Sequence, residues 1–186
     1  SYGLDDGVST LVASASTIEE LRSAEARLGR LYWGLYASRL VPPDLGFPGR
    51  RPRGGDPVNT ALDFLYALLR GVSHAALRVA GLNPYIGFMH HERSGRPSLT
   101  LDFMEAFRWA VERLLARLLA RGFRPSMAEG LLDHESRSVL ASAWAEALHS
   151  KLPRSGETLE EAIRRSAWGL ARSLREGSPW RPRLGV

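Results

Sequence analysis

Apolar residues recur at intervals of three and four along most of this chain, which is the spacing of one face of an α-helix. The pattern predicts five main helices: at about 17–40, 56–80 and 98–122, then one after Asp133 and one after Thr158 that ends at Gly177. Few segments alternate apolar and polar residues in the way that a strand does. We therefore expect an all-α helical bundle, folded as a single domain over residues 1–186.

The predicted helix starts carry residues that cap a first turn. Ser16 and Thr17 each precede a glutamate by three residues, and Thr158 precedes Glu161 in the same way, which is the capping-box pattern. Asp56 followed by proline marks another start, because proline fits the first helical position without losing a hydrogen bond.

Three segments lack the helical pattern: an irregular leader at 1–15, a loop at 41–56 and an irregular tail at 178–186. The loop alternates prolines with glycines and carries Arg50, Arg51 and Arg53, so we expect it to be flexible with a basic tip. These arginines suit a grip on a phosphate backbone, but a solvated connection explains the same residues equally well.

The apolar stripe of the first predicted helix consists of Leu21, Leu28, Tyr32 and Leu35, and Glu25 lies on it between the two leucines at 21 and 28. A carboxylate on an inward face is costly unless it is paired or binds a cation. Pairing with Arg27 or Arg30 is one explanation, and a cation site is the other.

The basic residues are almost all of one kind. Of 25 Lys and Arg residues only Lys151 is a lysine, and the formal net charge is +5. This excess favours an anionic partner, and arginine binds phosphate through two parallel hydrogen bonds. A coding bias explains the preference for arginine itself, but it explains less well why arginines cluster near Asp102 and Glu105.

Cysteine is absent, which excludes disulfides, thiolate zinc sites and cysteine nucleophiles. No apolar run is long enough to span a bilayer, so we expect no membrane association. The first seven residues carry two aspartates and no basic residue, unlike a signal peptide. The expected location is therefore the cytoplasm.

One histidine and two carboxylates form the main candidate for chemistry. Asp102 and Glu105 follow His90 by twelve and fifteen residues, and their spacing of three places them on one face of a helix. Acidic residues are common in a first turn, and a lone histidine is more often a hydrogen-bonded loop residue than a ligand. Together with Glu25, however, the set suits Mg²⁺ or Mn²⁺ acting on a phosphodiester.

Other catalytic classes have weaker support. His90 and His91 are adjacent and point in different directions in most backbones, and no His-Glu-x-x-His pattern supports a zinc site. No Gly-x-Ser-x-Gly elbow supports a serine hydrolase.

Several strings of residues resemble one known family. They are Asn-Pro-Tyr-Ile-Gly-Phe-Met-His at 83–90, Asp-Phe-Met-Glu-Ala-Phe-Arg at 102–108, Asp-Pro-Val-Asn at 56–59, and Glu25 followed by Tyr32 and Trp33. Over about residues 16–182 the chain resembles the CRISPR-associated endonuclease/integrase of spacer acquisition, the family numbered one among the Cas proteins.

The resemblance implies an α-helical catalytic domain that binds Mn²⁺ or Mg²⁺ and cleaves DNA or joins it by 3′-hydroxyl attack. It implies as partners double-stranded DNA (spacer and repeat), the small ferredoxin-like Cas protein numbered two and, in the full-length protein, a second copy of the chain. The β-rich N-terminal domain of the family has no counterpart here, so the chain corresponds to a shortened protein or a fragment.

The resemblance implies that the metal ligands come from Glu25, His90 and the Asp102/Glu105 pair. Glu25, His90 and Glu105 hold the metal, and Asp102 is a further ligand or positions metal-bound water. Contacts to DNA are expected from Arg50, Arg51, Arg53, Arg93, Arg96, Arg108 and, near the scissile phosphate, Tyr32. The alternatives are a non-catalytic basic helical module that binds DNA, or a truncated scaffold that mediates protein contacts.

Overall fold

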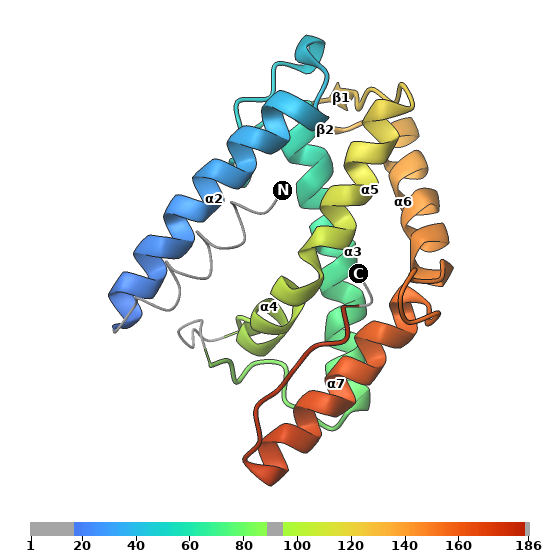
Figure 1. The fold of residues 1–186 in the computed structure, drawn as a ribbon. Helices are drawn as coiled ribbons and strands as arrows, with labels where there is room; N and C mark the ends of the chain where they lie inside the picture. The colour runs from blue at the N-terminus through green and yellow to red at the C-terminus, as the bar shows by residue number, and fades with distance from the viewer. Residues whose placement is uncertain (1–16, 89–94, 185–186) are drawn as a thin grey trace. The chain divides into compact units, whose positions relative to one another are not determined.

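Helices make up most of the structure, a computed structural model that describes residues 17–88 and 95–184 (Figure 1). The chain divides into two compact units, residues 1–51 and 52–186. The predicted all-α class is confirmed, whereas the prediction of a single domain stays a prediction. The predicted leader at 1–15 lies outside the described residues. Within the two described ranges, no helix is both long and apolar enough to cross a bilayer.

The first unit contains α2 (Ile18–Leu40) and the 3₁₀ turn η1 (Pro43–Leu45). The predicted capping box is present at the start of α2: the Thr17 hydroxyl accepts from the Glu20 N–H at 3.2 Å, and the Glu20 carboxylate accepts from the Thr17 N–H at 3.3 Å. These two bonds satisfy amide groups that have no partner inside the helix. The start of α2 is therefore fixed by local sequence.

The buried face of α2 differs from the predicted stripe. Tyr32 and Leu35 are 44% and 49% exposed, whereas Ala24 and Tyr36 are buried. The ring of Tyr36 meets that of Phe47, in the following loop, edge to face at 6.2 Å between centroids. This contact lies outside the helix, so helical spacing alone could not reveal which face it covers.

The expectation that Glu25 faces inward is wrong, because its side chain is exposed. Within the described part of the chain, Glu25 makes no ion pair with Arg27 or Arg30 either. An exposed carboxylate needs no cation to offset the cost of burial, so this reason for a metal at Glu25 no longer holds. The role of Glu25 as a metal ligand stays a prediction.

In the second unit, α3 (Pro57–Val79) is the central helix. It contacts the helices α4, α5, α6 and α7, which surround it in Figure 1. The Asp56 carboxylate caps its first turn by accepting from the Asn59 N–H at 2.9 Å, as the sequence predicted. Its fully buried residues Leu62, Leu65 and Leu69 recur at intervals of three and four, so they share one face of the helix.

The helix predicted at 98–122 is interrupted. It forms α4 (Ser98–Met104), the 3₁₀ turn η2 (Glu105–Phe107) and α5 (Arg108–Ala120). No glycine or proline marks the interruption, so local sequence gives no signal for it. The tighter turn lies between Phe103 and Phe107, which are both fully buried with ring centroids 5.5 Å apart. We attribute the change in helical geometry to the packing of these two rings in the core.

A short hairpin that the sequence did not predict follows α5. It pairs β1 (Met127–Ala128) with β2 (Leu131–Leu132), and both turn residues, Glu129 and Gly130, have positive φ values of 53° and 79°. Positive φ values at both positions are typical of the two-residue turns that join the strands of a β-hairpin. The helices α6 (His134–His149) and α7 (Leu159–Glu176) then begin at the predicted caps Asp133 and Thr158.

The C-terminal tail has no helix or strand in its described residues, as predicted, but it is held in place. The Trp180 ring stacks on Phe103 of α4 with centroids 5.6 Å apart, and its indole N–H donates to the Ser166 carbonyl of α7 at 3.0 Å. The tail therefore connects α7 with the helix that carries Asp102.

Candidate metal and DNA site

The predicted site residues are distributed over both units. Glu25, Tyr32, Arg50 and Arg51 belong to the first unit; Arg53, Arg96, Asp102, Glu105 and Arg108 belong to the second. His90 and Arg93 lie outside the described residues. Among the described residues, Glu105 of η2 and Arg108 of α5 are in contact, and Asp102 lies three residues before Glu105 on α4. The site is built from these residues upward.

Asp102 is a buried carboxylate with a fixed orientation. Its side chain is 7% exposed, and its Oδ2 accepts a hydrogen bond of 2.8 Å from the backbone N–H of Phe88. This bond joins α4 to the connector, the segment between α3 and α4 that contains His90. Phe88 precedes His90 by two residues.

Gly87 allows this close approach. A Cβ atom at this position would lie 2.8 Å from Oδ2 of Asp102 and 2.7 Å from Cβ of Ser98, which are both too short. The backbone of the connector therefore passes against α4 only because residue 87 has no side chain. The sequence string that resembles the family contains this glycine, and the structure shows a steric reason for it.

Glu105 is the first residue of η2 and lies more openly than Asp102. Its side chain is 48% exposed, and its Oε2 accepts from a terminal nitrogen of Arg108 at 2.8 Å. The two carboxylates predicted to act together therefore differ in surroundings: one is buried and held by backbone, and the other is half-exposed and held by a guanidinium.

Behind Glu105 lies a polar network that joins α3 to α5. The Tyr66 hydroxyl donates to Oε1 of the buried Glu112 at 2.5 Å and accepts from Arg108 at 3.3 Å. The guanidinium of Arg108 also lies 3.6 Å from Oε1 of Glu112 and 4.9 Å from the centre of the Tyr66 ring. One arginine thus connects the half-exposed Glu105 to a buried tyrosine and a buried carboxylate.

The electrostatics of this network keep the tyrosine protonated. Burial, and then the negative charge of Glu112, raise the pKa of Tyr66 above its ordinary value. The hydroxyl therefore stays protonated, as a donor to Glu112, to a higher pH than that of an ordinary tyrosine. The side chain of Arg108 is 31% exposed, so part of it faces solvent while it holds Glu105.

Sequence reasoning missed Tyr66 and Glu112 as site residues. Tyr66 looked like one more apolar position of α3. Glu112 follows the buried Val111 and lies four residues after Arg108, on the side of α5 that packs inward. A charged residue at such a position was the available signal, because carboxylates are rarely buried without a partner.

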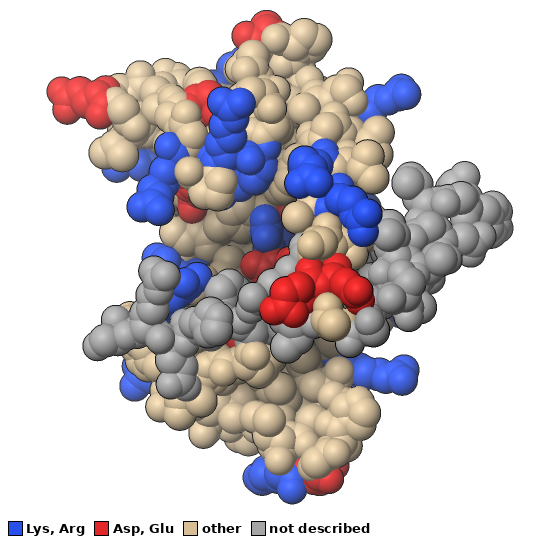
Figure 2. All heavy atoms as spheres, turned by 90° about the vertical axis from the view of Figure 1, so that its left-hand side faces the viewer, with Lys and Arg blue, Asp and Glu red and all other residues tan. Residues whose placement is uncertain are grey.

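The predicted DNA contacts vary in their surroundings. Arg53 has a positive φ of 59°, and its backbone N–H donates to Asp63 of α3 at 2.8 Å, so the end of the loop is tied to that helix. Arg51 and Arg53 are exposed, whereas Arg50 and Arg96 are half-buried. Figure 2 shows Lys and Arg side chains interspersed with Asp and Glu on one face, so that face is not uniformly basic.

A metal centre is not assembled by the described residues alone. In the ranges 17–88 and 95–184, no three His, Asp or Glu side chains lie close enough together to hold an ion. The predicted set includes His90, which lies outside those ranges, and Glu25, which lies in the other unit. Asp102 and Glu105 are its two members among the described residues of the second unit.

Comparison with known proteins shows one family. Residues 6–146 match the family model described as CRISPR associated protein Cas1. A protein named CRISPR-associated endonuclease Cas1 2, from Pyrobaculum aerophilum, is 39% identical over 163 residues, covering 88% of this chain and 51% of that protein. The chain spans about half the length of the curated relatives it matches.

Solved structures share the fold. A casposase bound to integration product superposes with a TM-score of 0.86 at 23% identity, over 99% of this chain and 55% of that chain. A Cas6-RT-Cas1–Cas2 complex superposes with a TM-score of 0.79 at 22% identity, over 93% of this chain and 20% of that chain. The match to the family model, the sequence relatives and the shared fold agree, and the chain belongs to the Cas1 family.

Proposed function

We propose that this chain is the helical catalytic part of a divalent-metal-dependent DNA endonuclease/integrase of CRISPR spacer acquisition. Its reactions are phosphodiester cleavage and transesterification on DNA. The observation that carries the proposal is the bond between the buried Asp102 carboxylate and the Phe88 N–H, two residues before His90. The bond holds the segment that contains His90 against α4, which carries Asp102 and leads directly into Glu105. A site shared by these residues requires such a contact.

The donor set fits Mn²⁺ or Mg²⁺. Asp102 and Glu105 supply carboxylate oxygens, and His90 and Glu25 would add one imidazole and one further carboxylate. A set rich in oxygen with a single nitrogen suits these hard cations better than zinc. When bound, such an ion stabilises negative charge on the oxygens of a phosphodiester.

The other residues of the site position Glu105. Arg108 holds its carboxylate at 2.8 Å, and Arg108 is itself held by Tyr66 and Glu112. Three side chains from two helices thus limit where the Glu105 carboxylate can lie. Preorganised ligands of this kind lower the cost of binding an ion in the required geometry.

DNA contacts are assigned to the arginines. We assign phosphate contacts to Arg93, Arg96 and Arg108, and to Arg50, Arg51 and Arg53 in the loop. Tyr32 is assigned a position near the scissile phosphate. Arginine suits this task because its guanidinium matches a phosphate with two parallel hydrogen bonds.

The partners follow from the names of the structural neighbours. One is a casposase bound to integration product, and another is a complex that contains Cas1 and Cas2. By extension, we assign to this chain double-stranded spacer and repeat DNA, the small ferredoxin-like Cas2 and, in the full-length protein, a second copy of itself.

A plasmid nicking assay with and without Mn²⁺ tests the proposal. We expect wild-type protein to nick supercoiled DNA only with the metal, and His90→Ala and Glu105→Gln to lose the activity. His134→Ala is the matched control, because His134 is exposed at the start of α6. Full nicking by His90→Ala would overturn the site. Salt-sensitive DNA binding without metal dependence would favour a non-catalytic binding module, and neither binding nor nicking would favour a scaffold.

A further inference from the structure

A groove between α5 and α6 is separate from the site of Asp102 and Glu105. Its volume is about 280 Å³. The groove is lined by Leu114 and Leu118 of α5, by Ala143 and Ala147 of α6, and by Leu152 in the segment that follows α6. Its floor is therefore largely apolar, and all of its lining belongs to the second unit.

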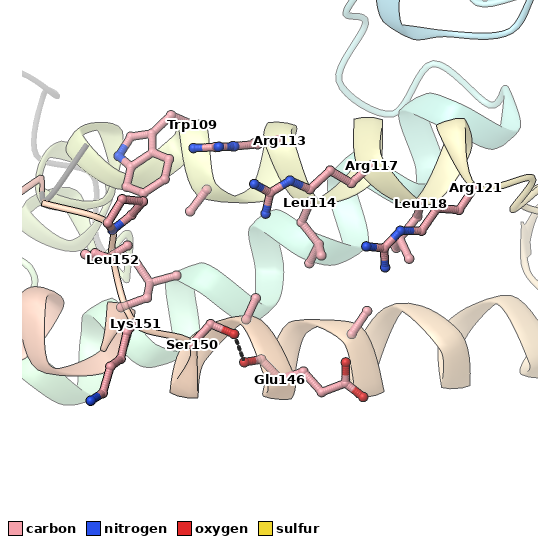
Figure 3. A pocket seen from close by; sticks show the side chains of 15 residues that line it. Trp109, Arg113, Leu114, Arg117, Leu118, Arg121, Glu146, Ser150, Lys151 and Leu152 are labelled. Atoms are coloured by element: carbon pink, nitrogen blue, oxygen red, sulfur yellow. Dashed lines mark hydrogen bonds between the residues drawn. The ribbon is translucent and has the colours of Figure 1, made fainter. Parts of the chain in front are cut away.

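The rim of the groove is basic. Arg113, Arg117 and Arg121 follow one another at intervals of four along α5, so they form a row on one side of the helix. Lys151 adds a fourth cation, and Glu146 is the one acidic residue of the lining. Figure 3 shows Arg117 and Arg121 reaching toward the gap between the two helices.

The three arginines of the row have no acidic partner within the described chain. Their guanidinium groups make neither a hydrogen bond nor an ion pair with any residue that the structure describes. Like charges four residues apart weakly destabilise a helix, and an anion bound to the row relieves that repulsion. Arg108, one turn earlier on the same helix, shows the contrast, because it is held by two glutamates.

We propose that this groove docks an acidic amphipathic segment of a protein partner. Apolar side chains of the segment fill the floor over Leu114 and Leu118, and its carboxylates bind the arginine row. Protein interfaces typically have an apolar centre and a polar or charged rim, and amphipathic helices bind grooves of this kind. The complementary charge of the segment supplies the anions that the row lacks.

Nucleic acid fits the groove less well. A phosphate backbone gains from the arginines, but it gains nothing from an apolar floor made of leucine and alanine side chains. The proposal concerns the face between α5 and α6 and does not depend on the proposed catalytic function.

Fluorescence anisotropy with two labelled helical peptides tests the proposal. One peptide carries leucines on one stripe flanked by glutamates, and the other replaces each glutamate with lysine. We expect the acidic peptide to bind wild-type protein and to lose at least about tenfold in affinity with Arg113→Glu/Arg117→Glu. The lysine peptide should bind that variant in preference to wild type, which is a rescue that misfolding cannot produce.

Two further variants separate charge from shape. Arg172→Glu/Arg175→Glu on α7 makes the same change in net charge at exposed residues away from the groove, so it should bind the acidic peptide as wild type does. Ala147→Phe fills the floor without changing charge and should weaken binding. No binding of the acidic peptide to wild type, or equal loss in both charge variants, overturns the proposal. Loss of duplex DNA binding alone in the α5 variant also overturns it and assigns the row to nucleic acid.

Discussion

The hydroxyl of Tyr66 on α3 lies 2.5 Å from Oε1 of Glu112 on α5, although the two residues are 46 positions apart in the sequence. Arg108 lies beside both and holds Glu105 on its other side. The carboxylate proposed to bind a metal is therefore attached to the core of the helical unit. Damage to this network is expected to affect both the stability of the unit and the position of Glu105.

Replacing Tyr66 with phenylalanine removes the hydroxyl and leaves the buried Glu112 carboxylate without one of its donors. We expect the free energy of unfolding to fall by about 1–2 kcal/mol, because a buried charged acceptor that loses a partner keeps its desolvation cost. Urea denaturation followed by circular dichroism measures the change. Tyr85→Phe is the control, because Tyr85 is 48% exposed and should change stability little. Equal stability of the two variants would contradict the network.

The raised pKa of Tyr66 gives a pH dependence. Because burial and Glu112 raise the pKa in the folded state above the ordinary value of 10.0, the folded protein keeps this proton more tightly than the unfolded chain. The contribution to stability is complete below about pH 10 and declines as pH rises further, since the unfolded tyrosine ionises first.

Tyrosinate absorbance measures this directly. At about pH 11, the folded Tyr66→Phe variant should show the same absorbance as wild type, because Tyr66 does not ionise there. A lower absorbance in Tyr66→Phe than in wild type would show that Tyr66 titrates normally, contrary to the structure.

Gly87→Ala tests the close packing of the connector on α4. The added Cβ would meet Oδ2 of Asp102 at 2.8 Å and the backbone carbon of Ser98 at 2.9 Å, so the chain must shift. We expect a loss of stability of about 1–3 kcal/mol. Gly71→Ala in α3 is the matched control, because its Cβ meets nothing within 4 Å. That variant should gain up to about 1 kcal/mol from helix propensity, and a similar gain in Gly87→Ala would refute the contact.

Trp180→Ala tests the attachment of the tail. The substitution removes the ring stacked on Phe103 and the hydrogen bond to the Ser166 carbonyl. We expect a loss of about 2–3 kcal/mol in thermal or urea unfolding, less than for a fully buried tryptophan. Trp168→Ala should cost less than about 1 kcal/mol, because Trp168 is 47% exposed. The reverse order of the two variants would mean that the tail does not brace α4.

Local signals in the sequence predicted much of the fold. The capping residues Thr17, Asp56, Asp133 and Thr158 each precede the observed first residue of a helix. Caps act within one turn, so the residues that decide a helix start are neighbours in the sequence.

Local sequence patterns did not predict the features that depend on tertiary packing. The break at Glu105–Phe107 depends on how Phe103 and Phe107 pack in the core, and no local residue announces it. The buried face of α2 depends on Phe47, which lies in the loop beyond that helix. The hydrogen bond between Tyr66 and Glu112 joins two helices. Hydrophobic periodicity predicts which face of its own helix each residue occupies, but it does not predict which residue of another helix it contacts.

Calorimetric titration with Mn²⁺ tests the central claim most directly, namely that His90 and the carboxylates of this chain hold a divalent ion. We predict binding at one site in wild type and in Glu135→Gln, an exposed acid in the first turn of α6, and loss of that binding in His90→Ala and in Glu105→Gln. Absence of Mn²⁺ binding in wild type, or unchanged binding in His90→Ala and Glu105→Gln, would contradict the claim.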